Sequence, residues 1–157
     1  RYTVTPLTSN QAPVAALSPK TLSIKTGESV VFDGSASTDD EGVASYSWST
    51  GGSAPTETVQ FDTPGTHTVT LTVMDNGVGM DEDALNKLYT LLDSDQPGHK
   101  ENYEWASIGL KNVHDRLRYL YGSDYGITLY STPGVGTVVK ATIPADLQNL
   151  AQEEPLC

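Results

Sequence analysis

The chain has 157 residues and a formal net charge of -11 at pH 7. This length suits one domain or two small ones. The acidic balance argues against binding to nucleic acid or to an anionic membrane, because Lys and Arg supply those contacts. No run of about 18 apolar residues and no signal-peptide pattern occurs, so we expect a soluble chain or an excised piece. The only cysteine is Cys157, which excludes an intrachain disulfide.

The first half of the sequence has the rhythm of an antiparallel β-sandwich. Residues 10–74 are rich in Thr, Ser, Val and Gly, and short alternating runs are separated by turn residues. The pattern predicts strands at 14–17, 21–24, 29–33, 43–48, 57–61 and 66–74. No part of this half has helical periodicity.

From Asp81 the apolar period changes to that of helices. One helix is predicted over 81–92, with Leu85, Leu88 and Leu92 on one face. A second is predicted over 108–121, with an apolar stripe of Leu110, Val113, Leu117 and Leu120 and a stop at Gly122. A hairpin of strands at 126–131 and 137–143 follows. We expect a mobile loop at 98–103 and a frayed tail at 145–157, in which 145–151 could form a short helix.

Several short motifs of the first half occur together. They are Asn-Gln-Ala-Pro at 10–13, Phe-Asp-Gly-Ser-Ala-Ser-Thr-Asp-Asp-Glu-Gly at 32–42, Tyr-Ser-Trp at 46–48 and Pro-Gly-Thr-His-Thr-Val-Thr-Leu-Thr-Val at 64–73. This combination resembles a PKD domain, an extracellular Ig-like sandwich that serves as a spacer or binding module.

The resemblance to a PKD domain implies a calcium site. Its oxygen ligands would be Asn10, Ser37, Asp39 and Glu41, which are donors of the kind that a hard cation prefers. The competing interpretation of these residues is a solvated Asx-type surface turn.

The second half carries three ordered motifs. They are Asp-Asn-Gly-Val-Gly-Met at 75–80, Ser-Ile-Gly-Leu-Lys-Asn-Val-His-Asp-Arg-Leu at 107–117 and Gly-Val-Gly-Thr-Val-Val-Lys-Ala-Thr-Ile-Pro at 134–144. Together they resemble the C-terminal half of the ATPase domain of two-component sensor histidine kinases. The resemblance implies an ATP or ADP site formed by Asp75, Gly77, Gly79, Gly109, Leu110 and Asn112. Amides at the start of the second helix would bind the phosphates. The alternative is that Asp75-Asn-Gly77 is only a turn.

Essential parts of such a kinase are absent. The asparagine-box helix, which would hold magnesium, and a helix carrying a phosphoacceptor histidine have no counterpart before Asp75. His67 falls in a strand, His99 in a loop and His114 in a helix, where we expect it to be a surface or packing residue. We therefore expect no enzymatic activity and at best weak, magnesium-insensitive nucleotide binding.

The two resemblances meet at 69–77, where a Val/Thr strand runs into Asp-Asn-Gly. The β half lacks its last strand, and the parent families face opposite sides of a membrane. We therefore expect a chimera, with an engineered fusion as the first interpretation and a natural recombinant as the alternative. It would be an α+β chain with a PKD-like sandwich at 1–75, half an ATPase domain at 76–150 and a tail at 151–157, joined through a shared strand. A strand within 1–9 could cover the open edge. Exposed helix faces predict burial within the chain, a homodimer or strand exchange.

Overall fold

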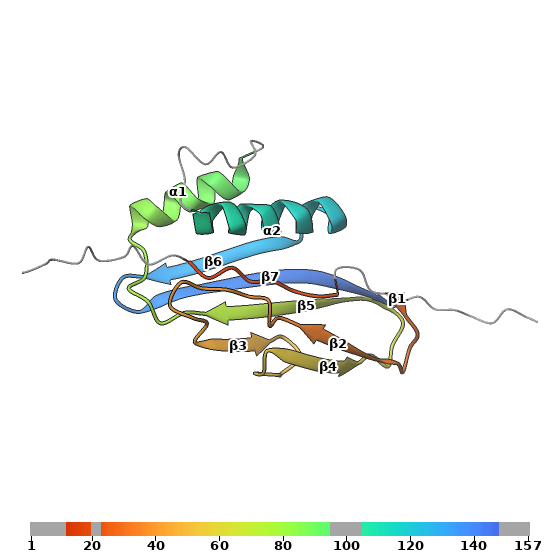
Figure 1. Cartoon of the computed structure of the whole chain (residues 1–157). Coiled ribbons are helices and arrows are strands. Elements are labelled where there is room, and N and C mark those ends of the chain that lie inside the picture. The colour runs from red at the N-terminus through yellow and green to blue at the C-terminus, as the bar shows by residue number, and fades with distance from the viewer. Residues whose placement is uncertain (1–11, 20–22, 95–104, 148–157) are drawn as a thin grey trace, which may run out of the picture.

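The structure is a computed structural model that describes residues 12–19, 23–94 and 105–147. Asn10, His99, the expected strand within 1–9, the loop at 98–103 and the tail from residue 148 lie outside these residues. Seven strands and two helices follow one another along the described chain (Figure 1): β1 Ser23–Ile24, β2 Ser29–Asp33, β3 Ser45–Trp48, β4 Thr56–Gln60, β5 Gly65–Met74, α1 Glu82–Asp93, α2 Trp105–Tyr121, β6 Gly126–Thr132 and β7 Gly136–Leu147.

One sheet runs through both halves of the sequence. Its order is β3-β5-β7-β6, all antiparallel neighbours, and β1 pairs in parallel with the last residues of β7. A separate antiparallel pair is formed by β2 and β4. Figure 1 shows α1 and α2 beside the β6 end of the sheet, and β2 and β4 beside its β3–β5 end. The fold is α+β, and β5 is the strand common to the sandwich and to the helical lobe, as predicted.

The edge that the missing last strand would leave open is covered by β7. All ten residues of β5 have partners in β7, from Gly65↔Leu147 to Met74↔Val138. The same strand pairs with β6 on its other side up to Thr142 and with β1 from Asp146. Strand β7 therefore serves the hairpin of the helical lobe and completes the sandwich at the same time.

The apolar core lies on one face of this sheet. The register places Trp48, Leu71, Ala141 and Ile127 in one row across the four strands, and opposed residues of neighbouring strands point to the same side. All four side chains are buried. Both helices and the β2–β4 pair contribute to the same cluster, with residues such as Leu88, Leu110, Leu117, Val30 and Phe32. The predicted helix faces are therefore buried to a large extent within the chain.

Three elements differ from the sequence-based predictions. Residues 14–17 form no strand, and only isolated bridges join Val14 to Thr38 and Ser18 to Asp33. Helix α2 begins at Trp105, one turn earlier than predicted. The last strand continues to Leu147, so the helix expected from 145 is wrong. Pro144 is tolerated within this strand because it lies between the β6 and β1 pairings, where no described residue needs a hydrogen bond from an N–H at this position.

Candidate functional site

Asp75 follows β5 directly and is 2% exposed. Its Oδ1 accepts hydrogen bonds from the backbone N–H of Gly77, at 2.8 Å, and of Thr137, at 3.0 Å. The Asp75 N–H donates to the Thr137 carbonyl oxygen at 3.0 Å, which extends the pairing between the strands. Its Oδ2 is buried and has no hydrogen-bond partner among the residues that the structure describes. One oxygen of this carboxylate therefore fixes the turn, whereas the other makes no hydrogen bond within the described chain.

The 39–41 turn presents a second carboxylate of the same kind. Asp39 Oδ2 accepts the Glu41 N–H at 3.1 Å, whereas Asp39 Oδ1 is buried and has no partner within the described ranges. Burial raises the pKa of Asp39, although the Glu41 hydrogen bond opposes the rise, and the negative charges of Asp75 and Asp40 raise it further. The Ala44 N–H donates to the Met74 carbonyl oxygen at 2.8 Å, which places the segment before β3 beside the end of β5. This pairing brings the turn of Asp39 to the same end of the sheet as Asp75, although the two residues lie 36 positions apart in the sequence.

The other expected calcium ligands have different surroundings. The Ser37 hydroxyl accepts the Ala16 N–H at 3.0 Å and donates to the Ala16 carbonyl oxygen at 3.3 Å, so it anchors the 12–19 segment. Glu41 is exposed, and Asn10 lies outside the described residues. The described part of the chain contains no group of three or more His, Cys, Asp or Glu side chains able to hold a metal. A cation at Asp39 and Asp75 would therefore need other oxygens as well.

The glycines of the box at 75–80 allow the β6–β7 turn to approach closely. Gly79 has a φ of 69°, and a Cβ there would overlap the Thr132 carbonyl oxygen. At Gly136 a Cβ would lie 2.6 Å from the Asp75 carbonyl oxygen. Gly77 is buried and donates its N–H to Asp75. These glycines have a packing role that is independent of any nucleotide. Gly136 and Thr137 also contact Asp75, and the sequence motifs did not indicate either contact.

The residues predicted to lie near the phosphates of a nucleotide are within α2 rather than at its start. Gly109 and Leu110 belong to the second turn, where backbone N–H groups bond to carbonyls of the preceding turn. Leu110 is fully buried. A Cβ on Gly109 would lie 3.3 Å from a methyl group of Val14, so the 12–19 segment packs against this turn. Asn112 is exposed. The structure brings none of these three into contact with Asp75.

Two buried polar side chains of α2 have structural partners. Lys111, 2% exposed, donates from Nζ to the Ser94 carbonyl oxygen and to Asp115 Oδ1, both at 2.6 Å. It thereby closes the C-terminal end of α1. His114 Nδ1 accepts the Ile127 N–H at 3.1 Å, and burial lowers the pKa of this imidazole. The expectation that His114 is a packing residue agrees with its position between α2 and β6.

Comparisons with known proteins find both resemblances. Residues 10–87 match the PKD domain family. An uncharacterized sensor-like histidine kinase of Rhizobium meliloti is 34% identical over 84 residues, which cover 54% of this chain and 15% of the kinase. This chain thus spans about 15% of that relative's length. A solved structure of carbohydrate-binding modules from the β-sandwich superfamily is 39% identical, with a TM-score of 0.38, over 43% of this chain and 30% of that chain.

Among the described residues, no helix has the length and hydropathy needed to cross a membrane.

Proposed function

We propose that this chain is a non-catalytic module that binds a divalent cation of the calcium type between Asp39 and Asp75. The observation that supports the proposal is the pair of buried, unpartnered oxygens, Asp39 Oδ1 and Asp75 Oδ2. A buried carboxylate without a partner destabilises a fold, and two such charges destabilise it more. A hard cation with carboxylate ligands removes both costs. Asn10, just before the described residues, is the further oxygen donor that we expect.

The match to the PKD domain family supports a binding module rather than an enzyme, and it includes both carboxylates. Glu41 fixes the orientation of Asp39 through its backbone N–H, and Gly77 and Thr137 do the same for Asp75. Both free oxygens are thus held in place before a ligand arrives. Preorganisation of this kind lowers the entropic cost of binding.

A second candidate function is weak binding of ATP or ADP, which the similarity to the sensor-like histidine kinase favours. In this hypothesis Asp75 Oδ2 accepts a hydrogen bond from the adenine amino group, and Gly77, Gly79, Gly109, Leu110 and Asn112 line the site. The cation and the nucleotide would both contact Asp75 Oδ2, so the two ligands would compete for this oxygen. Without an asparagine box we expect no kinase activity and no effect of magnesium on nucleotide affinity.

The chimeric origin of the chain belongs to the same proposal. Similarity to two unrelated kinds of protein and the double role of β7 support a fusion, and we infer an engineered one.

A homodimer or a strand-exchanged dimer also stays a prediction. Size-exclusion chromatography with light scattering checks it: a compact monomer at high protein concentration would remove the dimer and leave the cation site unaffected.

Thermal unfolding in calcium and in EDTA tests the cation site. At one hundred times the dissociation constant, a bound ion adds about 2.7 kcal/mol to the free energy of unfolding. That value corresponds to a rise of roughly 5–11 °C in melting temperature for a chain of this size. A melting temperature that does not change with calcium up to ~10 mM, which is above the dissociation constants of calcium-binding modules, would overturn the proposal.

Two variants distinguish cation binding from nucleotide binding. Asp39→Asn should abolish the calcium response but leave ADP binding intact, whereas Asp75→Asn should abolish both. Because the pKa of Asp39 is raised, its charge opposes folding above pH 3.8, so Asp39→Asn should raise the melting temperature in EDTA at pH 7. Asp62→Asn, an exposed acid elsewhere, is the control and should leave both ligand responses unchanged.

A further inference from the structure

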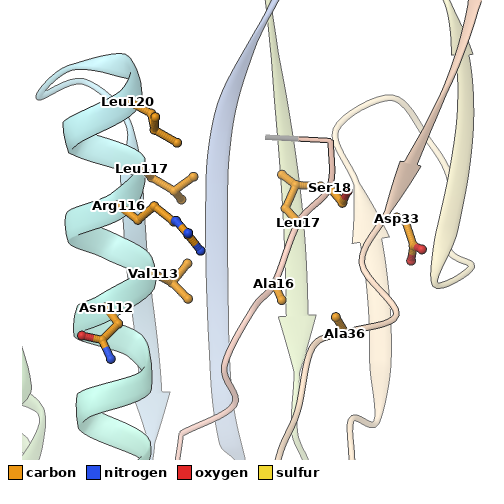
Figure 2. Close-up of a pocket in the computed structure, with 10 residues that line it drawn as sticks. All are labelled: Ala16, Leu17, Ser18, Asp33, Ala36, Asn112, Val113, Arg116, Leu117 and Leu120. Carbon is orange, nitrogen blue, oxygen red and sulfur yellow. The ribbon is translucent and has the colours of Figure 1, made fainter. Parts of the chain in front are cut away.

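A cavity of about 410 Å³ lies between α2 and the sandwich. It has one wall from the helix and one from the sandwich, so neither lobe would form it alone (Figure 2). Its volume falls within the range of small-molecule sites. Ten of the described residues line it: Ala16, Leu17, Ser18, Asp33, Ala36, Asn112, Val113, Arg116, Leu117 and Leu120.

Among the described residues that line the cavity, apolar side chains are combined with one cation. Val113, Leu117 and Leu120 follow one another along one face of α2, and Arg116 lies beside them. Arg116 forms no hydrogen bond or ion pair with the residues that the structure describes, whose single salt bridge joins Lys111 and Asp115. Figure 2 shows Arg116 directed away from α2, toward the side of the cavity where Ala16 lies.

We propose that this cavity binds a small carboxylic acid with an apolar body. The guanidinium of Arg116 matches the fork geometry of a carboxylate, and it is only weakly hydrated, so an anion replaces its water at little cost. The aliphatic side chains of α2 and Leu17 would cover the apolar body of the ligand.

Asp33 lies on the other side of the cavity, and its Oδ1 accepts the Ser35 N–H at 2.8 Å. Figure 2 shows its carboxylate directed away from α2. Arg116 is the cation of the described lining, so the acid group of the ligand is expected at the α2 wall, beside Arg116 and Asn112. This site lies on residues other than Asp39 and Asp75, so it is independent of the proposed cation.

Titration with decanoate and with 1-decanol, which has the same apolar body without the charge, tests the proposal. Calorimetry at 0.15 M salt should show saturable binding of decanoate at least tenfold tighter than of decanol. Arg116→Gln should abolish the difference between the two ligands. Lys87→Gln, which removes an exposed cation from α1, should leave it unchanged. Equal affinity of the two ligands in the wild-type protein would overturn the role of Arg116.

Filling the cavity provides a second, independent test. Ala16→Leu and Ala36→Leu add volume from two separate segments of the wall and should each weaken decanoate binding more than tenfold. The far-ultraviolet circular dichroism and the melting temperature check that each variant is folded. If neither folded variant weakens binding, decanoate binds elsewhere and the cavity assignment is wrong. If the wild-type protein shows no saturable binding below ~1 mM, about -4.1 kcal/mol, the cavity is only a packing gap between the lobes.

Discussion

Replacing Ile127 by Ala in β6 should destabilise the distant sandwich as much as the helical lobe. Ile127 is 4% exposed and lies in the same core row as Trp48, three strands away. The sandwich depends on β7 for its last strand, and β7 is held in the helical lobe by β6. The two lobes should therefore unfold together.

The structure gives the size of this coupling. The ten residue pairs between β5 and β7 correspond to about one backbone hydrogen bond each. At roughly 0.5–1.5 kcal/mol net per bond, loss of β7 would cost about 5–15 kcal/mol, which equals the whole stability of a typical domain. Truncating a buried Ile to Ala costs about 2–5 kcal/mol, or a drop of roughly 4–20 °C in melting temperature.

Two probes follow the two lobes in a Trp105→Phe background. Fluorescence then reports on Trp48, which is buried in the sandwich, and circular dichroism at 222 nm reports on α1 and α2. In Ile127→Ala both transitions should move to lower temperature by the same amount. Thr128→Ala, on the exposed face of the same strand, should change the free energy of unfolding reported by either probe by less than about 0.5 kcal/mol.

A dichroism transition that moves to lower temperature while the Trp48 transition stays in place would refute the reasoning. That outcome would mean that the sandwich folds without β7 and that the shared pairing contributes little free energy.

Three further changes have defined outcomes. Lys111→Met removes the cation that closes the end of α1 and should cost about 1–3 kcal/mol in chemical denaturation, whereas Lys87→Met should cost little. Gly79→Ala creates an overlap with the Thr132 carbonyl oxygen at positive φ and should lower the melting temperature even without ligand. Burial lowers the pKa of His114, so stability is full above about pH 6.5 and falls below it; His114→Gln should flatten the melting profile between pH 7 and pH 5.

Local patterns in the sequence predicted most of the elements. Leu88 and Leu92 are buried on one face of α1, as their spacing indicates, and the alternation in β5 places Val69, Leu71 and Val73 in the core. Helix α2 begins one turn before its predicted start, because the residues before 108 have no recognisable capping signal. The extension of β7 through Pro144 could not be foreseen, because it depends on an unpaired gap between two neighbouring strands.

The candidate site was predicted in parts but not as a whole. Asp39 and Asp75 were assigned to two different families and two different ligands, since short motifs describe only their own neighbourhood. Their proximity depends on the pairing of β3 with β5 and on the turn that precedes β3. The cavity at Arg116 had no signal in the sequence, because its two walls come from segments about 80–100 positions apart.

The sequence by itself determined the two kinds of lobe and the strand at which they meet, because periodicity and turn residues act over a few neighbouring positions. Only the tertiary structure decided how the incomplete sandwich is closed. An exposed strand edge must pair, and β7 is long enough to pair with β5 along its whole length while it still holds β6. The side chains of a strand do not specify which other strand its backbone will pair with. The pairing of β5 with β7 is therefore known only from the tertiary structure.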